Sequence, residues 1–206
     1  MIYALGDLHL DHSKEKSMDI FGTNWIDHDK KIFANWLNLI SDEELVLIPG
    51  DVSWAMKLEE AYEDLKEIDK LPGIKIITKG NHDYWWDSKN KLKKLDLNSI
   101  YFLQNDYYLY KEVYITGCRG WIAKDSDNFS EHDEKIYTRE LNRLKLSLSS
   151  IENKGNKLIT MMHYPPFNLD GTPNDFVYLM KEYNVDICIY GHLHSDGHKY
   201  AVEGNV

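Results

Sequence analysis

The sequence predicts an α/β fold, with a mixed sheet or a pair of sheets covered by helices, on the basis of two patterns along the chain. Short apolar runs that read as buried strands alternate with segments whose apolar residues recur at helical spacing. In the middle of the chain, three short apolar runs follow one another in quick succession, which indicates a meander of strands. Alternating strands and helices favour a sheet covered by helices, and the meander makes the arrangement mixed.

Each predicted strand is a short apolar run bounded by turn residues. Five such runs are well separated along the chain, at residues 2–5, 45–48, 74–77, 158–161 and 186–190. The central meander comprises residues 100–104, 107–111 and 113–116. Within it, Asn105-Asp106 provides the turn between the first two strands.

Each predicted helix places apolar residues on one face. In the first of them, Ile32, Phe33 and Trp36 recur at helical spacing. Pro72-Gly73 ends the second helix ahead of the next strand. The predicted helices are residues 28–40, 57–70, 89–95, 131–150 and 175–183.

Length and composition indicate a single domain that spans residues 1–206. The formal net charge of -10 argues against a large binding surface for nucleic acid or an anionic membrane. No secretory signal or stretch long enough to cross a bilayer is visible. The two cysteines, Cys118 and Cys188, lack the spacing of a disulfide framework. We therefore expect a protein of the reducing cytoplasm.

Residues that bind divalent metals follow the ends of the five separated strands. In open α/β sheets, ligands bind in the crevice at the carboxyl ends of the strands. Side chains placed at five strand ends should therefore meet at one site. The candidate ligands are Asp7, His9, Asp51, Asn81, His163, His192 and His194.

This set of ligands suits two metal ions. Asp7 and His9 are two residues apart, so their side chains share a face of an extended chain, and His192 and His194 have the same spacing. The two carboxylate oxygens of Asp51 suit a bridge between cations. Seven ligands are too many for one tetrahedral zinc site and fit two metals of higher coordination. Oxygen and imidazole ligands without thiolate suit Mn, Fe, Zn or Co, among which we favour manganese.

Two further residues of the Gly80-Asn81-His82-Asp83 block suggest acid–base chemistry. His82 is next to a ligand and need not face the same metal. A histidine in such a position can hydrogen-bond a phosphoryl oxygen or protonate a leaving alkoxide. Asp83 is predicted to hold the imidazole of His82 in one tautomer.

Taken in order, the blocks Asp-x-His, Gly-Asp, Gly-Asn-His-Asp, a lone His and Gly-His-x-His run from Gly6 to His194. In this the chain resembles the calcineurin-like metallophosphoesterase superfamily. The resemblance implies a four-layer α/β/β/α sandwich of two mixed sheets flanked by helices. It also implies one metal on Asp7, His9 and His194, a second on Asn81, His163 and His192, a bridge by Asp51, and an acid or stabilising role for His82.

Departures from the family pattern narrow the expectation. Phosphoprotein phosphatases place an Asp-Arg pair after the Gly-Asp block, and purple acid phosphatases place a Tyr ligand three residues after the Asp. Here Val52-Ser53-Trp54 follows, so we expect neither type. Repair nucleases share Asp7-Leu8-His9-Leu10 but usually carry additional domains. Only twelve residues follow His194, so we expect a second sheet that is short or completed by another chain, which leaves a homo-oligomer open.

Substrate-binding candidates lie outside the ligand set. Arg119, in a turn flanked by glycines, could grip a phosphate oxygen in place of the missing Arg. A structural ion pair with one of the many carboxylates is the alternative for Arg119. His12 could line the site, although such a histidine is more often solvated. His28 and His132 lie in polar stretches and are predicted to be surface residues.

We therefore expect a hydrolase of phosphoric ester bonds that cleaves a small phosphodiester or phosphomonoester. The expected mechanism is in-line attack at phosphorus by a hydroxide that bridges two metals. The partner is then a small phosphorylated substrate, without membrane or nucleic acid. One alternative is a nuclease that acts on short or single-stranded ends, against which the net charge counts. The other is a non-catalytic scaffold of the same fold, which would typically lack some ligands or His82.

Overall fold

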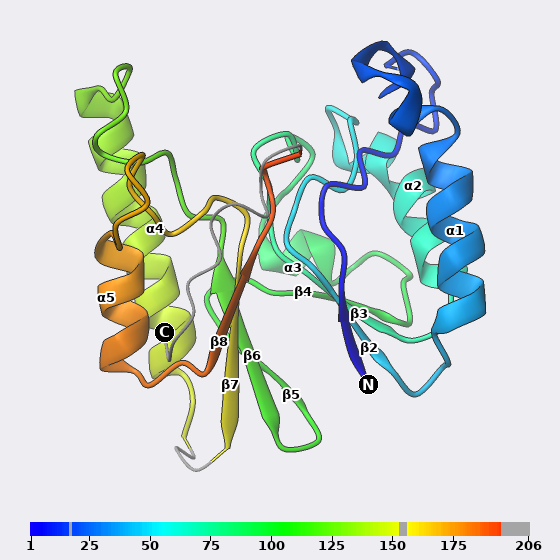
Figure 1. Ribbon diagram of the computed structural model, residues 1–206. Coiled ribbons are helices and arrows are strands. Elements are labelled where there is room, and N and C mark those ends of the chain that lie inside the picture. Colours follow the sequence, from blue (N-terminus) through cyan, green and yellow to red (C-terminus); the bar gives the residue numbers. More distant parts are fainter. Residues whose placement is uncertain (17, 153–155, 195–206) are drawn as a thin grey trace.

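The computed structural model describes residues 1–16, 18–152 and 156–194, and it arranges two four-stranded sheets between layers of helices (Figure 1). The first sheet has the order β1-β2-β3-β4, all parallel in its described pairs. Its strands are Ile2–Ala4, Leu45–Ile48, Ile74–Ile77 and Ile100–Phe102.

The second sheet has the order β5-β6-β7-β8. Here β5 pairs antiparallel with β6, and the other pairs are parallel. Its strands are Tyr108–Tyr110, Val113–Cys118, Lys157–Met162 and Ile187–Tyr190. Among the described strands, the first sheet is parallel throughout and the second sheet is mixed.

The predicted meander is divided between the two sheets. The strand β4 joins β3 in the first sheet, and the chain then turns so that β5 and β6 form a hairpin in the second. The turn contains Asn105 with a φ of 60°, a left-handed conformation that Asn tolerates better than most residues. Three successive strands therefore connect two sheets, where the sequence suggested one local meander.

Helices cover the outer face of each sheet. In Figure 1, α1 and α2 lie on one side of the molecule and α4 and α5 on the other, with the sheets between them. The helices are α1 His28–Leu39, α2 Leu58–Lys70, α3 Lys89–Leu92, α4 Glu131–Ser149 and α5 Asp175–Glu182, with short 3-10 helices at Met18–Phe21 and Thr23–Trp25. None of the helices in the described ranges is both long and apolar enough to cross a membrane.

Local sequence explains where the later helices begin. At the start of α4, the backbone N–H of Ser130 donates to the Asp133 carboxylate at 2.9 Å, and the Ser130 hydroxyl accepts from the Asp133 N–H, which forms a capping box. At the start of α5, the side-chain oxygen of Asn174 accepts from the Phe176 N–H at 3.0 Å.

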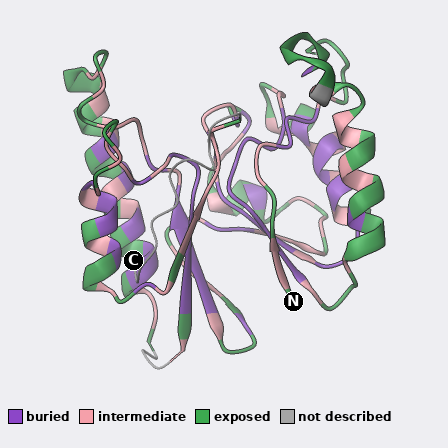
Figure 2. Cartoon of the chain, viewed as in Figure 1, coloured by how far each residue is buried: buried purple, intermediate pink, exposed green. Residues whose placement is uncertain are grey.

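Three apolar clusters hold the layers together. One lies between the first sheet and its helices and includes Trp36 and Leu65, and a second lies between the second sheet and α4 and α5. The third, with Leu47, Ile76 and Met161, fills the space between the sheets. Figure 2 shows the corresponding burial in the strands and on the inner faces of the helices. The four-layer α/β/β/α sandwich is thereby confirmed.

Candidate metal centre

The loops after β1, β2, β3, β7 and β8 meet at one edge of the two sheets. Backbone hydrogen bonds continue between these loops beyond the strands: the Asp7 N–H donates to the Gly50 carbonyl at 3.1 Å, and the Gly191 N–H donates to the His163 carbonyl at 3.2 Å. The His192 N–H also donates to both carboxylate oxygens of Asp7, at 3.2 and 3.0 Å. The two sheets are thus joined directly at the predicted site.

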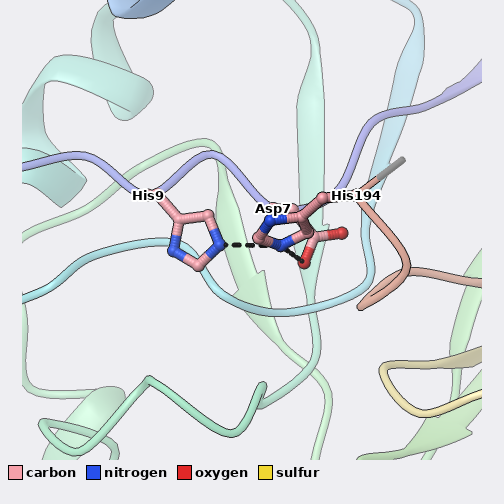
Figure 3. A group of neighbouring side chains, drawn as sticks. All are labelled: Asp7, His9 and His194. Carbon is pink, nitrogen blue, oxygen red and sulfur yellow. Dashed lines mark hydrogen bonds and ion pairs between the residues drawn. The ribbon is translucent and has the colours of Figure 1, made fainter. Parts of the chain in front are cut away.

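The first candidate ligand group, which we call the first ligand group, is Asp7, His9 and His194, whose ligand atoms lie close enough together to hold a metal ion (Figure 3). The Nε2 atoms of His9 and His194 lie 3.1 Å apart, and His194 Nε2 lies 3.3 Å from Asp7 Oδ1. Asp7 and His9 follow β1 of the first sheet, whereas His194 follows β8 of the second. This group therefore draws its side chains from both sheets.

Asn81, His163 and His192 form a second candidate ligand group, called the second ligand group below. Its three side chains converge on Asn81 Oδ1, which lies 2.6 Å from His163 Nε2 and 2.9 Å from His192 Nδ1. The two imidazole nitrogens are 3.3 Å apart. His163 Nδ1 is 3.0 Å from the carbonyl oxygen of Pro49. Since a carbonyl can only accept, this contact places the proton on Nδ1 and leaves Nε2 free to act as a ligand.

Asp51 lies between the two groups. Its Oδ2 is 3.8 Å from His9 Nε2 and 3.3 Å from His163 Nε2. Its Oδ1 accepts a hydrogen bond from the His82 N–H at 2.8 Å. The orientation of the carboxylate is therefore fixed by one oxygen, and the other oxygen faces both ligand groups.

The ligand atoms of this site have lone pairs that suit divalent cations. Asp51 Oδ2 is buried and accepts no hydrogen bond within the described part of the chain. Burial lowers the pKa of His9 to about 4 and that of His192 to about 4, so both imidazoles are neutral near pH 7 and have a lone pair to offer a metal. Two neutral imidazoles and a buried carboxylate oxygen that accepts no hydrogen bond from the described residues form an electron-rich centre, which a cation would satisfy.

Glycines make room for this centre. A Cβ atom on Gly80 would lie 2.1 Å from Asp51 Oδ1, and one on Gly191 would lie 2.6 Å from Asp7 Oδ2. Both distances are far below van der Waals contact. The glycines that precede Asn81 and His192 in the sequence blocks therefore let the backbone pass against the carboxylates.

His82 lies at the side of the first ligand group. Its ring centroid is 5.7 Å from that of His9 and 4.4 Å from that of Trp54. Trp54 also stacks on His9, with centroids 4.8 Å apart and ring planes at 21°. In the sequence Trp54 served only to argue against a tyrosine ligand, and its packing against the two imidazoles was not predicted.

The structure corrects the role predicted for Asp83. Its buried carboxylate accepts hydrogen bonds from the N–H groups of Asp51 and Gly80, at 2.9 and 2.7 Å, from the Val52 N–H at 2.9 Å, and from the Trp85 indole at 3.0 Å. Burial raises the pKa of Asp83 to about 6, and the backbone donors act in the opposite direction. Asp83 therefore fastens two metal-site loops together and does not orient the imidazole of His82.

Arg119 is also placed differently from the phosphate-gripping prediction. Its guanidinium donates to the buried Glu140 carboxylate at 3.1 Å and lies over the Trp121 ring at 4.3 Å. Arg143 donates to the same carboxylate oxygen at 3.2 Å. The backbone carbonyl of Arg119 accepts from the His163 N–H at 3.1 Å. The ion-pair alternative is therefore correct, and Arg119 supports His163 through its main chain.

The histidines outside the two ligand groups differ in exposure and in contacts. His12 is exposed and lines a separate cavity with acidic residues such as Glu63 and Asp64, apart from the ligand groups. His28 is partly exposed, and its Nε2 lies 2.9 Å from the Leu8 carbonyl, a contact with the loop between Asp7 and His9 that the sequence did not predict. His132 is exposed, as predicted.

Comparisons with known proteins find similarity along most of the chain. A family model described as calcineurin-like phosphoesterase matches residues 1–196, a range that includes every residue of both ligand groups. An uncharacterized protein of Methanocaldococcus jannaschii is 23% identical over 170 residues, which make up 82% of this chain and 87% of that protein. The crystal structure of a protein of unknown function from Aquifex aeolicus has a TM-score of 0.45 and 20% identity, covering 97% of this chain and 92% of that one.

Proposed function

The chain belongs to the calcineurin-like phosphoesterase family, and from that premise we propose that it hydrolyses a small phosphodiester or phosphomonoester with two divalent cations. The observation that carries the proposal is the position of Asp51, whose Oδ2 faces His9 of one ligand group and His163 of the other. When bound, two cations would neutralise charge on the phosphoryl group and lower the pKa of a water that attacks phosphorus in line.

The side chains of the protein would hold and orient this chemistry. Asp7, His9 and His194 would hold one cation, Asn81, His163 and His192 the other, and Asp51 both. His82 lies beside the first group and is partly accessible, so it can donate a proton to the leaving alkoxide or a hydrogen bond to a phosphoryl oxygen. Trp54 restricts the rotation of His82 and His9 by contact with both rings.

The same geometry favours phosphodiesters over phosphomonoesters. After Asp51 the chain continues with the buried Val52 and Ser53, so the Asp-Arg pair expected of a phosphoprotein phosphatase is absent. Arg119 is engaged by Glu140 and is not available to replace it. A diester carries less charge on the transferred group than a monoester and depends less on such a cation.

Hydrolysis of bis(p-nitrophenyl) phosphate and p-nitrophenyl phosphate tests the proposal directly. The protein is first treated with a chelator and then assayed with added Mn²⁺, and Asp51→Asn is assayed beside it. We expect Mn²⁺-dependent turnover by the wild-type protein, faster with the diester, and loss of most bound metal and nearly all turnover in Asp51→Asn. Full turnover after chelation, or an Asp51→Asn variant with two metals and an unchanged rate, would contradict the proposal.

A further inference from the structure

A mostly apolar cavity of about 220 Å³ adjoins the second ligand group. His192, one of the proposed metal ligands, forms part of its wall. The metal-centre chemistry uses none of the other wall residues. They include Trp121, Ala123, Tyr164, Phe167 and Leu169.

Aromatic rings line this cavity from the metal ligand outward. The ring centroid of Tyr164 lies 4.5 Å from that of His192 and 5.4 Å from that of Trp121. The Trp121 ring is itself fixed, because its indole N–H donates to Asp133 at 3.0 Å and the Arg119 guanidinium lies over it at 4.3 Å. The cavity therefore has preformed flat walls, of the kind that favour planar rings.

Two of the segments that line the cavity are held together by their own contacts. One runs from β6 to α4 and the other from β7 to α5, and both leave the same ends of the second sheet (Figure 1). The Leu169 N–H of the second segment donates to the Asp125 carboxylate of the first, at 2.9 and 3.1 Å. Gly120 has a φ of 72°, and a Cβ there would meet the side chain of Tyr164 at 3.2 Å. This glycine lets Trp121 approach Tyr164.

The size of the cavity suits a single ring or a small fused ring. An apolar protein cavity of about 150 Å³ is enough to admit benzene, and drug-sized ligands occupy about 300–1,000 Å³. At about 220 Å³ the cavity falls between these values. Ser126 and Asn168 add polar groups to a wall that is otherwise mainly apolar, as in sites that orient a ring by a few hydrogen bonds.

We propose that this cavity binds a planar aromatic group esterified to the phosphate of the substrate. The inference rests on the proposed function, because a phosphoryl group held at the metal centre would present its ester substituent to the cavity past His192. The aromatic group would stack on the walls formed by Trp121 and Tyr164. It would thereby select aryl or nucleoside esters over alkyl esters.

Two non-hydrolysable phosphonates isolate this contribution. Benzylphosphonate has the shape of phenyl phosphate, and ethylphosphonate has that of methyl phosphate, with the same charged group. Their dissociation constants are measured by calorimetry with the Mn²⁺-loaded protein. Burial of the ring predicts at least about tenfold tighter binding of benzylphosphonate by the wild-type protein.

Ala123→Phe fills the cavity without changing a ligand, and Ala34→Phe, at an exposed position of α1, is its matched control. We expect Ala123→Phe to bind the two phosphonates equally and Ala34→Phe to keep the preference. Leu169→Ala provides a second test that adds no bulk, with the exposed Leu146 of α4 changed to Ala as its control. Of these two substitutions, only Leu169→Ala should selectively weaken the binding of benzylphosphonate.

The outcomes separate this inference from the proposed function. If ethylphosphonate binds and benzylphosphonate binds no better, the cavity does not accept the ring, although the phosphate site stands. If neither binds and neither p-nitrophenyl ester is hydrolysed, both proposals are overturned. The phosphonate analogue of thymidine 5′-monophosphate is then compared with benzylphosphonate. Tighter binding of the thymidine analogue would identify the aromatic group as a nucleobase, and equal binding would identify it as a simple aryl group.

Discussion

At the scale of single residues, the metal centre is built on unfavourable backbone conformations. Asp7, His9, Asp51 and His192 all have a positive φ, between 45° and 73°. Non-glycine residues seldom adopt this region, and each such residue costs on the order of 1–3 kcal/mol. Glycine would relieve the strain at each position but would remove the ligand. The conformations are therefore consistent with residues retained for their side-chain chemistry.

His82 is the residue whose replacement should affect catalysis without affecting the metals. Its ring contacts Trp54 and approaches His9, and its side chain belongs to neither ligand group. We expect His82→Ala to retain both metals and to lower turnover by roughly 10²–10⁴, the usual range for general acid–base catalysis. Metal content is measured by mass spectrometry and turnover with the p-nitrophenyl esters.

The exposed His132, at the start of α4, provides the control for His82. His132→Ala should leave both metal content and turnover unchanged. An unchanged rate in His82→Ala would remove this histidine from the mechanism. A loss of metal in that variant would instead mean that the His82 ring supports the position of His9, because the backbone N–H that donates to Asp51 is kept in His82→Ala.

At the scale of structural elements, the loop after β3 shows where sequence reasoning failed. The order Asn-His-Asp suggested that Asp83 orients its neighbour His82. In the structure, the loop turns so that the Asp83 carboxylate points into the protein, toward the N–H groups of Asp51, Val52 and Gly80. Adjacency in sequence did not predict side-chain direction, because direction in a loop depends on its backbone conformation.

Asp83→Asn should therefore loosen the metal-site loops. An amide can replace the carboxylate shape but presents an NH₂ group, which cannot accept from the backbone donors. Each bond lost at a buried donor costs roughly 1–3 kcal/mol. We expect a lower unfolding free energy in urea and weaker binding of Mn²⁺. Asp87→Asn, at a carboxylate in a surface ion pair with Lys91, is the control and should change neither; equal effects of the two substitutions would contradict this role for Asp83.

The strand β3 contains a buried lysine at the end away from the metal centre. Lys75 is fully buried, and its Nζ donates to the Leu71 carbonyl and to the Ser99 hydroxyl, the latter at 2.9 Å. The sequence predicted a buried strand here, and the charged residue in it was not explained. The carbonyl at the end of α2 provides the reason, because the lysine satisfies an acceptor that the helix leaves open.

Burial lowers the pKa of Lys75 from 10.5 to about 8, which predicts a dependence of stability on pH. Between about pH 8 and 10.5 the folded state binds fewer protons at this group than the unfolded state, so stability should rise with pH in this window. The gain should approach roughly 3 kcal/mol. Urea unfolding of the wild-type protein and Lys75→Met at pH 7.5, 9 and 10.5 measures it. The unfolding free energy of the wild type should rise relative to that of Lys75→Met as the pH increases. Unfolding free energies that change with pH in parallel in the two proteins would contradict the prediction.

At the scale of the whole molecule, strand ends were predictable and the partition between sheets was not. The position of Asp51 or His163 could be inferred because a continuous apolar run precedes each, and such runs are typical of buried parallel strands. The assignment of β4 and β5 to different sheets depends on contacts distant in sequence, such as the Tyr110 hydroxyl donating to the Glu43 carbonyl at 2.7 Å. Local patterns do not contain this information.

Arg119 illustrates the same limit for the site. The Gly-flanked arginine after β6 indicated either a phosphate ligand or an ion pair, and both readings fit the local sequence. Glu140, which decides between them, lies on α4 at 0% exposure and 21 residues away. Its buried charge requires a partner. The choice between the two roles of Arg119 therefore depends on tertiary packing, which the local sequence does not contain.

Metals bound by the two ligand groups would link the sheets. His194, after β8, completes a group with Asp7 and His9 from the first sheet, and Asn81, after β3, completes the group of His163 and His192. Ligands from both sheets must be in place together, so cation binding should stabilise the folded state as a whole. At a Mn²⁺ concentration about 100-fold above Kd, mass action gives about 2.7 kcal/mol, or roughly 5–10 °C in the unfolding midpoint of a chain of this length.

Chelation should therefore lower the unfolding midpoint of the wild-type protein, while Asp51→Asn, which lacks the shared ligand, should respond little. Amide hydrogen exchange distinguishes a link between sheets from binding to one sheet. With Mn²⁺ added, we expect slower exchange at the ends of both β3 and β7, because a cation in the second group would hold Asn81 and His163 together. Protection confined to one of these strands would mean that the cations bind one sheet and leave the other free to separate.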